Sequence, residues 1–200
     1  MRTLLVIAVL ALGLSACGHK PPDQVENACL ILEDNRSWWR ALKRTEDRWG
    51  VSPGIQLAIL KRESSFNGRA RPARTRLLGF IPGPRPSDAY GYAQALEATW
   101  EWYQEETGRG GADRDDFDDA VDFIGWYTHM STRLSGISRS DARALYLAYH
   151  EGHGGYNRGS YRGKDWLLRA ADQVERDART YDAQIERCRR RLNRGWIPFL

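Results

Sequence analysis

The chain has 200 residues, and its 30 Lys and Arg against 26 Asp and Glu give a formal net charge of +4. This length suits a hydrophobic core of useful size, and we expect one domain rather than several. The positive balance favours an anionic partner, for which nucleic acid is the usual first candidate.

The first 16 residues have the pattern of a secretory signal peptide. Arg2 precedes an apolar run from Leu4 to Leu14, and small residues close the segment. The apolar run is too short to anchor the chain across a bilayer, so we expect residues 1–16 to be absent from the mature protein.

The exit of this leader, Leu14-Ser15-Ala16-Cys17, resembles the bacterial lipobox, whose cysteine is acylated and becomes the new N-terminus. This implies attachment to a membrane through lipid on Cys17, and two or three acyl chains give stable anchoring. Gly18 in place of Asp resembles the signal for the outer membrane, which predicts a lipid-anchored protein on its periplasmic face. There peptidoglycan is the available polyanion, and nucleic acid is not expected as a partner. The alternative is an ordinary signal peptide with an incidental cysteine.

Two further cysteines, Cys29 and Cys188, lie near the two ends of the expected domain. In an oxidising compartment they are candidates for a disulfide that joins the N- and C-terminal helices. The alternative is a pair of free buried thiols.

Beyond a tether at residues 17–24, the apolar residues follow helical periods, so residues 25–200 are expected to form a single all-α domain. A first helical stretch runs to Gly50 with a break near Asn35, and a second begins at Ser52 and Pro53. The other expected helices cover residues 96–108, 115–136, 141–152, where Ser140 is the expected cap, and 164–192.

Two segments between these helices are expected to be loops. Residues 67–90 are rich in Pro, Arg and Gly, and such a long loop beside a candidate acid is expected to shape access to it. Residues 152–166 are rich in Gly, Tyr and Arg, and form either a surface for sugar faces and carboxylates or a solvated connector.

Glu63 is the candidate acid. It follows Ile55 and Ile59 at helical spacing, which places a carboxylate on an apolar stripe. Loss of hydration there raises the pKa of a carboxyl and lets it donate a proton near neutral pH. The alternative is a helix-end residue that pairs with Arg62 or Arg69.

Two more patterns follow along the chain. Gly91-x-x-Gln94 combines a close backbone approach with an amide that can bind a sugar, and Ala148-Tyr149-x-x-Gly152 ends a helix. Alone, Tyr149 reads as a core residue. In order, E-S-x-F at residues 63–66, G-x-x-Q and A-Y-x-x-G resemble the SLT-type lytic transglycosylases, which have a goose-lysozyme-like fold. The resemblance covers about residues 50–163.

The resemblance implies an enzyme that cleaves the bond between N-acetylmuramic acid (MurNAc) and N-acetylglucosamine (GlcNAc) in peptidoglycan and leaves 1,6-anhydroMurNAc ends. Glu63 matches the single catalytic acid and base. Ser64 matches a serine that holds the sugar beside the acid, and Phe66 matches the aromatic residue packed below it. No cofactor is implied.

Further matches concern substrate binding. Gln94 matches the groove glutamine and Gly91 the glycine that makes room for the sugar, while Tyr149 matches the tyrosine whose hydroxyl contacts the acid. Two positions depart from the pattern: Ala93 replaces a usual Met and predicts a roomier groove, and His150 replaces a usual Asn and either keeps its hydrogen bond or makes activity pH-dependent.

Three rival readings remain open. A muramidase would use water and a second carboxylate, with Asp88, Glu97 and Glu151 as candidates. A peptidoglycan-binding lipoprotein would keep the groove without catalysis, and a DNA-binding protein is a distant third.

No metal site is expected, because the histidines lack paired ligand spacing. No motif identifies an envelope protein partner. The Arg- and Trp-containing tail that ends at Leu200 either packs on the domain or lies on an anionic membrane.

Overall fold

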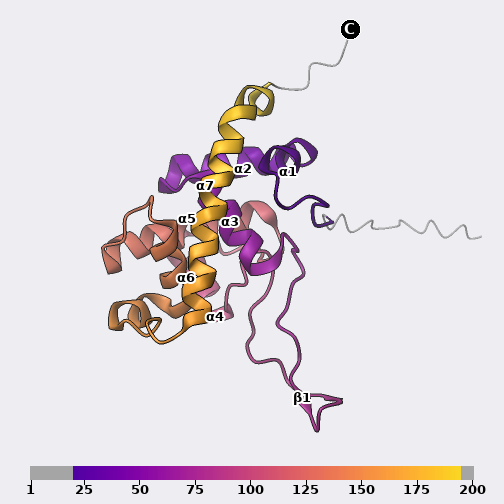
Figure 1. Ribbon diagram of the computed structural model, residues 1–200, viewed down its shortest axis with the longest axis vertical. Helices are drawn as coiled ribbons and strands as arrows, with labels where there is room; N and C mark the ends of the chain where they lie inside the picture. The colour runs from indigo at the N-terminus through magenta and orange to yellow at the C-terminus, as the bar shows by residue number, and fades with distance from the viewer. Residues whose placement is uncertain (1–19, 195–200) are drawn as a thin grey trace, which may run out of the picture.

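The structure is a computed structural model that describes residues 20–194, apart from the side chain of Leu77. Over this range the chain forms seven helices and one short hairpin (Figure 1). Their bounds are α1 (Ala28–Asp34), α2 (Arg36–Trp49), α3 (Pro53–Ser64), β1 (Arg76–Leu77), β2 (Ile81–Pro82), α4 (Glu97–Thr107), α5 (Phe117–Ser135), α6 (Ala142–Arg158) and α7 (Asp165–Asn193). The all-α prediction is confirmed.

The sequence signals at the first helices are confirmed. Asn35 separates α1 from α2, and Gly50 ends α2 in a left-handed conformation with φ of 75°. Ser52 caps α3 by accepting a hydrogen bond from the backbone N–H of Ile55, and Pro53 occupies its first turn.

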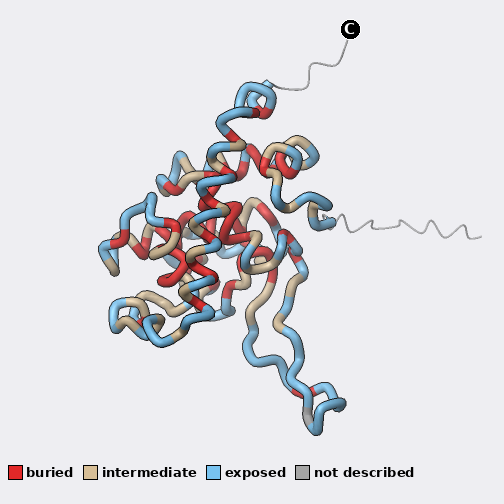
Figure 2. The backbone as a smooth tube through the Cα atoms, viewed as in Figure 1, coloured by how far each residue is buried: buried red, intermediate tan, exposed pale blue. Residues whose placement is uncertain are grey.

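Helix α3 is the centre of the core rather than an amphipathic helix with one apolar stripe. Every residue from Pro53 to Leu60 is buried, and the long helix α7 packs along α3. Figure 2 shows the buried positions concentrated on these inner helices, while the outer turns are exposed. Glu63 therefore lies in the last turn of a helix whose first eight residues are buried, at the point where the helix borders a cleft.

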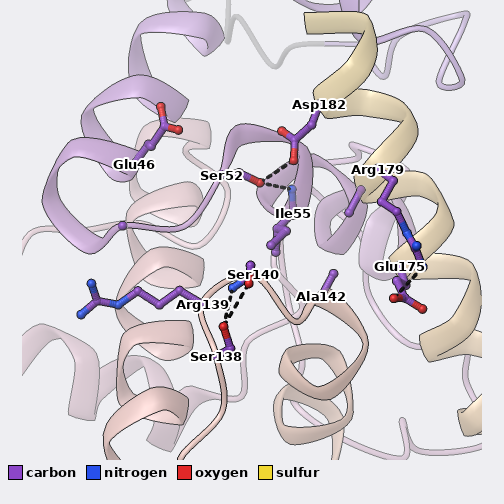
Figure 3. Close-up of a pocket in the computed structure, with 12 residues that line it drawn as sticks. Glu46, Ser52, Ile55, Ser138, Arg139, Ser140, Ala142, Glu175, Arg179 and Asp182 are labelled. Atoms are coloured by element: carbon purple, nitrogen blue, oxygen red, sulfur yellow. Dashed lines mark hydrogen bonds and ion pairs between the residues drawn. The ribbon is translucent and has the colours of Figure 1, made fainter. Parts of the chain in front are cut away.

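Asp182 of α7 fixes the start of α3 (Figure 3). Its carboxylate accepts hydrogen bonds from Ser52 Oγ at 2.7 Å and from the backbone N–H of Gly54 at 2.8 Å. A Cβ at Gly54 would lie 2.4 Å from the carboxyl carbon of Asp182 and 2.5 Å from the carbonyl oxygen of Ala178. Only glycine lets α3 and α7 approach this closely.

A second buried carboxylate, Asp122 of α5, holds α2, α4 and α5 together. It accepts hydrogen bonds from the hydroxyl of Tyr103 at 2.8 Å and from the indole of Trp49 at 2.9 Å. Arg48 and Arg109 pair with it at 3.1 and 3.0 Å. This network fixes the helices that form one wall of the cleft described below.

The two ends of the described chain are joined covalently. Cys29 of α1 and Cys188 of α7 form a disulfide, with their Cα atoms 6.1 Å apart and a sequence separation of 159. Beside it, Gln184 Oε1 accepts from the backbone N–H of Ala28 at 2.8 Å. Helix α1 is thereby attached to α7, which itself packs on α3.

Residues 67–90, here called the arm, leave the helical body and carry the hairpin at their far end (Figure 1). Strands β1 and β2 pair antiparallel, with Leu77 opposite Ile81, and form the one sheet within residues 20–194. Below the hairpin, Thr75 exchanges backbone hydrogen bonds with Gly83 and Pro84 at 2.7 and 2.9 Å. The sequence predicted a loop over residues 67–90, and the hairpin is where the structure differs from that prediction.

Helix α6 differs from its prediction at both ends. Its cap is Asp141, which accepts from the backbone N–H of Ala144, rather than Ser140. The helix also continues past Gly152, which kinks it at φ 71° and ψ 157°, and ends at Arg158. Much of the expected glycine-rich loop is therefore helical, since glycine alone adopts this kink without strain.

The expected signal peptide, Cys17 and the end of the C-terminal tail lie outside the described residues. Of the helices within residues 20–194, none is long and apolar enough to cross a bilayer.

Candidate active site

A cleft of about 460 Å³ opens at the C-terminal end of α3. The base of the arm and the segment before α4 form one side of it, and α5 and α6 form the other. Its lining residues are Glu63, Ser87, Ala89, Gln94, Ala95, Leu96, Thr99, Phe123, Tyr127, Tyr149, His150, Glu151 and Gly152. Of the residues expected in the site, the cleft brings together Glu63, Gln94, Tyr149 and His150.

The E-S-x-F motif is a helix end that aims Glu63 into this cleft. After Ser64, the backbone turns through two residues in the left-handed region, Ser65 and Phe66, with φ of 50° and 62°. The turn drives the Phe66 ring into the core, where it is fully buried and stacks on Trp38. Ser64 Oγ donates to the carbonyl of Leu60 at 3.2 Å, which anchors it within the helix. Phe66 and Ser64 thus fix the last turn of α3.

The surroundings of Glu63 change its acidity. Burial raises the pKa of Glu63 from 4.5 to about 7, although a hydrogen bond from Tyr146 and the charge of Arg62 both lower it. The residue keeps intermediate exposure because the cleft reaches it. A carboxyl with this pKa is present in both protonation states near neutral pH, so it can donate a proton and take one back.

Two tyrosines of α6 lie near Glu63. Tyr149 donates its hydroxyl to the carbonyl of Ala93 at 2.6 Å, and Tyr146 lowers the pKa of Glu63. The charge of Glu63 raises the pKa of both tyrosines, and the expected contact between Tyr149 and Glu63 stays a prediction. Burial, and then the charge of Glu63, raise the pKa of Tyr149 well above its ordinary value, so its hydroxyl stays neutral. The signal that could have found Tyr146 is its spacing, three residues before Tyr149 on one helix face.

Gly91 has a different role from the one expected, while the expected sugar-binding role of Gln94 stays a prediction. Gln94 lines the cleft, and its Nε2 donates to the carbonyls of Ala70 and Gly91, each at 2.9 Å. The two N–H groups of the Gln94 amide thus bind the backbone at the base of the arm. The amide oxygen remains available to accept a hydrogen bond from a ligand. Gly91 gives no room to a sugar: a Cβ there would lie 1.9 Å from the carbonyl oxygen of Arg114. Glycine is needed because two backbone segments cross at this point.

Ala93 does not widen the groove. Its side chain is 1% exposed and belongs to the core, and only its carbonyl, through Tyr149, touches the wall of the cleft. The prediction of a roomier groove is wrong, because the side chain at this position points into the protein.

One of the three candidate second carboxylates lines the cleft. Glu151 binds Lys164 Nζ through both oxygens at 2.7 and 2.9 Å, and also accepts from Ser160. The Nδ1 of His150 lies 3.1 Å from Glu151 Oε1. Burial favours the protonated form, but the hydrogen bonds from Lys164, Ser160 and His150 lower the pKa of Glu151 to about 2. Glu151 is therefore ionised at neutral pH.

The other two candidate carboxylates, Asp88 and Glu97, lie at the start of α4. Asp88 Oδ1 accepts from the backbone N–H of Glu97 at 3.4 Å, and neither residue lines the cleft. Within residues 20–194, no group of three or more His, Cys, Asp or Glu side chains is arranged to hold a metal ion.

Sequence reasoning missed the aromatic wall of the cleft. Tyr127 and Phe123 of α5 line it beside Tyr149, with the Tyr127 and Tyr149 ring centroids 5.1 Å apart. Tyr127 and Phe123 are four residues apart on one apolar helix, and this spacing is typical of residues buried in a hydrophobic core. Only the packing of α5 against α6 turns their rings to an open surface.

A second hollow of about 500 Å³ lies at the opposite end of α3 (Figure 3). Its acidic and basic groups are largely paired within the chain, as Arg179 with Glu175 at 2.6 Å and Asp182 with Ser52. It holds none of the predicted site residues, so the cleft at Glu63 is the candidate active site.

Comparison with known proteins places the chain in a family. A family model described as the transglycosylase SLT domain matches residues 5–188 of the chain. A comparison with curated proteins gives no match. The chain therefore belongs to the SLT-type lytic transglycosylase family, whose domain acts on peptidoglycan.

Proposed function

We propose that this protein cleaves the MurNAc–GlcNAc bond of peptidoglycan strands by intramolecular transglycosylation, with Glu63 as the single acid and base. The observation that carries the proposal is the position of Glu63: a carboxyl whose pKa burial raises to about 7, at the end of a buried helix and on the wall of a cleft. The E-S-x-F motif and the family membership support the same residue.

The reaction needs one proton donor that later accepts a proton. Protonated Glu63 gives its proton to the glycosidic oxygen, and the bond from this oxygen to the muramic acid C1 breaks as GlcNAc leaves with a new hydroxyl. The N-acetyl group of the muramic acid supports the positive charge at C1. The C6 hydroxyl of the same sugar then attacks C1 and gives its proton to the Glu63 carboxylate. Glu63 ends protonated, and no water is consumed.

Glu151 is the group that a hydrolase would need, and its environment suits that role poorly. Lys164 binds both of its oxygens, and Ser160 and His150 occupy them further. A carboxylate with a pKa of about 2 is a weak base toward water. We infer that Glu151 positions the end of α6 and contributes a fixed negative charge to the cleft.

The remaining cleft residues are assigned to sugar binding. The rings of Phe123, Tyr127 and Tyr149 offer apolar faces to the sugar, and the Gln94 amide oxygen offers an acceptor. Ser64 and Phe66 act indirectly, because they fix the helix turn that carries Glu63.

The proposed location rests on the sequence of the leader. Residues 1–16 are proposed to be a signal peptide, and Cys17 to carry lipid on the periplasmic face of the outer membrane. Residues 18–24 then serve as a tether to the domain. Mass spectrometry of the protein from membranes tests this: an acylated N-terminal peptide beginning at Cys17 is expected, and an unmodified terminus elsewhere would contradict it.

The deciding experiment is mass spectrometry of the fragments released from purified peptidoglycan by the wild-type protein and by Glu63→Gln. The wild type is expected to release anhydro ends, lighter by one water than reducing ends, and the variant to be slower by about 10²–10⁴-fold. Glu97→Gln is the matched control, since it removes a carboxyl outside the cleft and is expected to keep full activity.

Two other results would each replace the proposal. Reducing ends, lost in a Glu151→Gln variant, would make the protein a muramidase with Glu151 in the reaction. Binding to peptidoglycan without any released fragment, unchanged by Glu63→Gln, would make it a binding module.

A further inference from the structure

The arm ends in an exposed apolar cluster. Leu78 and Phe80 at the tip of the hairpin are 83% and 74% exposed, and Ile81 beside them is 43% exposed. The other large apolar side chains exposed in the described part of the chain are Leu30 on α1, Leu96 before α4, Leu134 on α5 and Trp166 on α7, so no other segment carries more than one of them. The tip is thus a concentration of apolar surface that has no packing function within the chain.

The hairpin turn displays this cluster at a cost in backbone conformation. Leu78 and Gly79 both lie in the left-handed region, with φ of 52° and 81°. A leucine disfavours this region, whereas glycine adopts it freely, and a Cβ at Gly79 would meet no atom within 4 Å. In this conformation the Leu78 side chain is exposed at the tip of the hairpin.

Most of the arm behind the tip is positively charged, and its single carboxylate, Asp88, lies at the base. Residues 67–87 contain no Asp or Glu and include five arginines: Arg69, Arg71, Arg74, Arg76 and Arg85. The contacts of these arginines are with neutral groups, as Arg71 over the ring of Tyr90 at 4.1 Å and Arg74 on the carbonyl of Gly83 at 3.3 Å. Among the described ion pairs, none neutralises an arm arginine.

We propose that the arm binds the surface of an anionic phospholipid bilayer, with Leu78, Phe80 and Ile81 inserted among the acyl chains and the arginines beside the phosphates. Apolar residues next to arginines suit the boundary between headgroups and hydrocarbon. A glycan strand offers the arginines carboxylates but gives the apolar tip no hydrocarbon to enter. Figure 2 shows the arm exposed along most of its length, so it is free to meet a surface.

The arm connects the proposed membrane contact to the cleft. Ser87 and Ala89, at the base of the arm, line the cleft that holds Glu63. A tip held in a bilayer would therefore fix how this wall of the cleft faces the membrane, independently of any lipid on the N-terminus.

Vesicle co-sedimentation of the chain from Gly18 to Leu200 tests the proposal. This chain lacks the leader and Cys17 but keeps the whole described core, from Ala28 to Leu192. Phosphatidylcholine vesicles with phosphatidylglycerol are compared with phosphatidylcholine alone. Binding is expected with the anionic vesicles, and the double variant Leu78→Ser, Phe80→Ser is expected to lower the partition coefficient by about tenfold or more.

Two matched controls separate the arm from general surface effects. Leu30→Ser with Leu134→Ser removes two exposed leucines on α1 and α5 and is expected to bind like the wild type. Arg69→Glu with Arg76→Glu is expected to abolish the preference for anionic vesicles. Arg40→Glu with Arg187→Glu makes the same change in net charge on exposed helix positions and is expected to retain most of that preference.

Circular dichroism of each variant checks the fold, and release of peptidoglycan fragments by the tip variant checks the cleft. The proposal is overturned if the wild type ignores anionic vesicles, or if the tip variant binds them equally. It is also overturned if the tip variant loses binding to purified peptidoglycan instead, which would make the arm a wall contact. None of these outcomes depends on whether Glu63 is catalytic.

Discussion

Tyr146 of α6 lowers the pKa of Glu63 at the end of α3, and the charge of Glu63 raises the pKa of Tyr146. The tyrosine hydroxyl favours the ionised carboxylate and so opposes the burial that keeps Glu63 protonated. The pKa of about 7 is the balance of these two effects. The tyrosine therefore sets the pH range over which Glu63 can both donate and accept a proton.

Replacement of Tyr146 by Phe should move the pH dependence of cleavage. Without the hydroxyl of Tyr146, burial acts with less opposition, so the pKa of Glu63 should rise further, by roughly one pH unit. In a profile of fragment release against pH, the loss of activity on the alkaline side should move to higher pH. Tyr127→Phe is the control, since its hydroxyl bonds the carbonyl of Ala148 at 3.3 Å. An unshifted profile in Tyr146→Phe would show that Tyr146 does not set the acidity of Glu63.

The two glutamates of the cleft should affect stability in opposite directions. Between pH 4.5 and about 7 the unfolded chain releases the Glu63 proton and the folded protein keeps it, so stability falls as pH rises through that window. Glu63→Gln should therefore stabilise the protein by about 1–3 kcal/mol at pH 8 and change little at pH 4.

Glu151 has the reverse linkage. Its folded pKa of about 2 lies below its ordinary value of 4.5, so its contribution to stability is present above pH 4.5 and is lost as pH falls toward 2. Glu151→Gln should destabilise the protein by about 1–3 kcal/mol at pH 8. Urea unfolding of both variants at pH 4 and 8 measures this, and equal effects of the two substitutions at pH 8 would contradict the assigned environments.

Gly54→Ala should separate α3 from α7. The new Cβ would overlap the carboxyl group of Asp182 and the carbonyl of Ala178, at a cost of about 1–3 kcal/mol. Gly154→Ala is the matched control, because the nearest atom to its Cβ is the flexible end of Arg158 at 3.2 Å. Thermal unfolding should show a lower Tm for Gly54→Ala alone. Fragment release should fall with it, since α3 carries Glu63.

Reduction of the Cys29–Cys188 disulfide should destabilise the domain strongly. The bond closes a loop of 159 residues, which in the chain-entropy model corresponds to about 4–5 kcal/mol. The denaturant midpoint of the oxidised chain from Gly18 should exceed that of the reduced chain and of Cys29→Ser. Titration of thiols in denaturant should find none in the oxidised protein, and two free thiols there would show that the bond does not form.

Much of this protein could be predicted from local sequence alone. The break at Asn35, the end of α2 at Gly50 and the start of α3 at Ser52 depend on backbone conformations that a few neighbouring residues decide. The order of the motifs also predicted the family, and it made Glu63 the candidate acid, because Glu63 lies at the end of a helix that the sequence marks clearly.

The tertiary structure decided what the motif residues touch. The same helix face carries Tyr146 and Tyr149, and only the packing of α6 against α5 and α7 determines that the Tyr149 hydroxyl meets the carbonyl of Ala93. Gly91 likewise faces Arg114, which is 23 residues away along the chain. Helical periods show which residues share a face, but not which partner that face meets, because that choice depends on contacts distant in sequence.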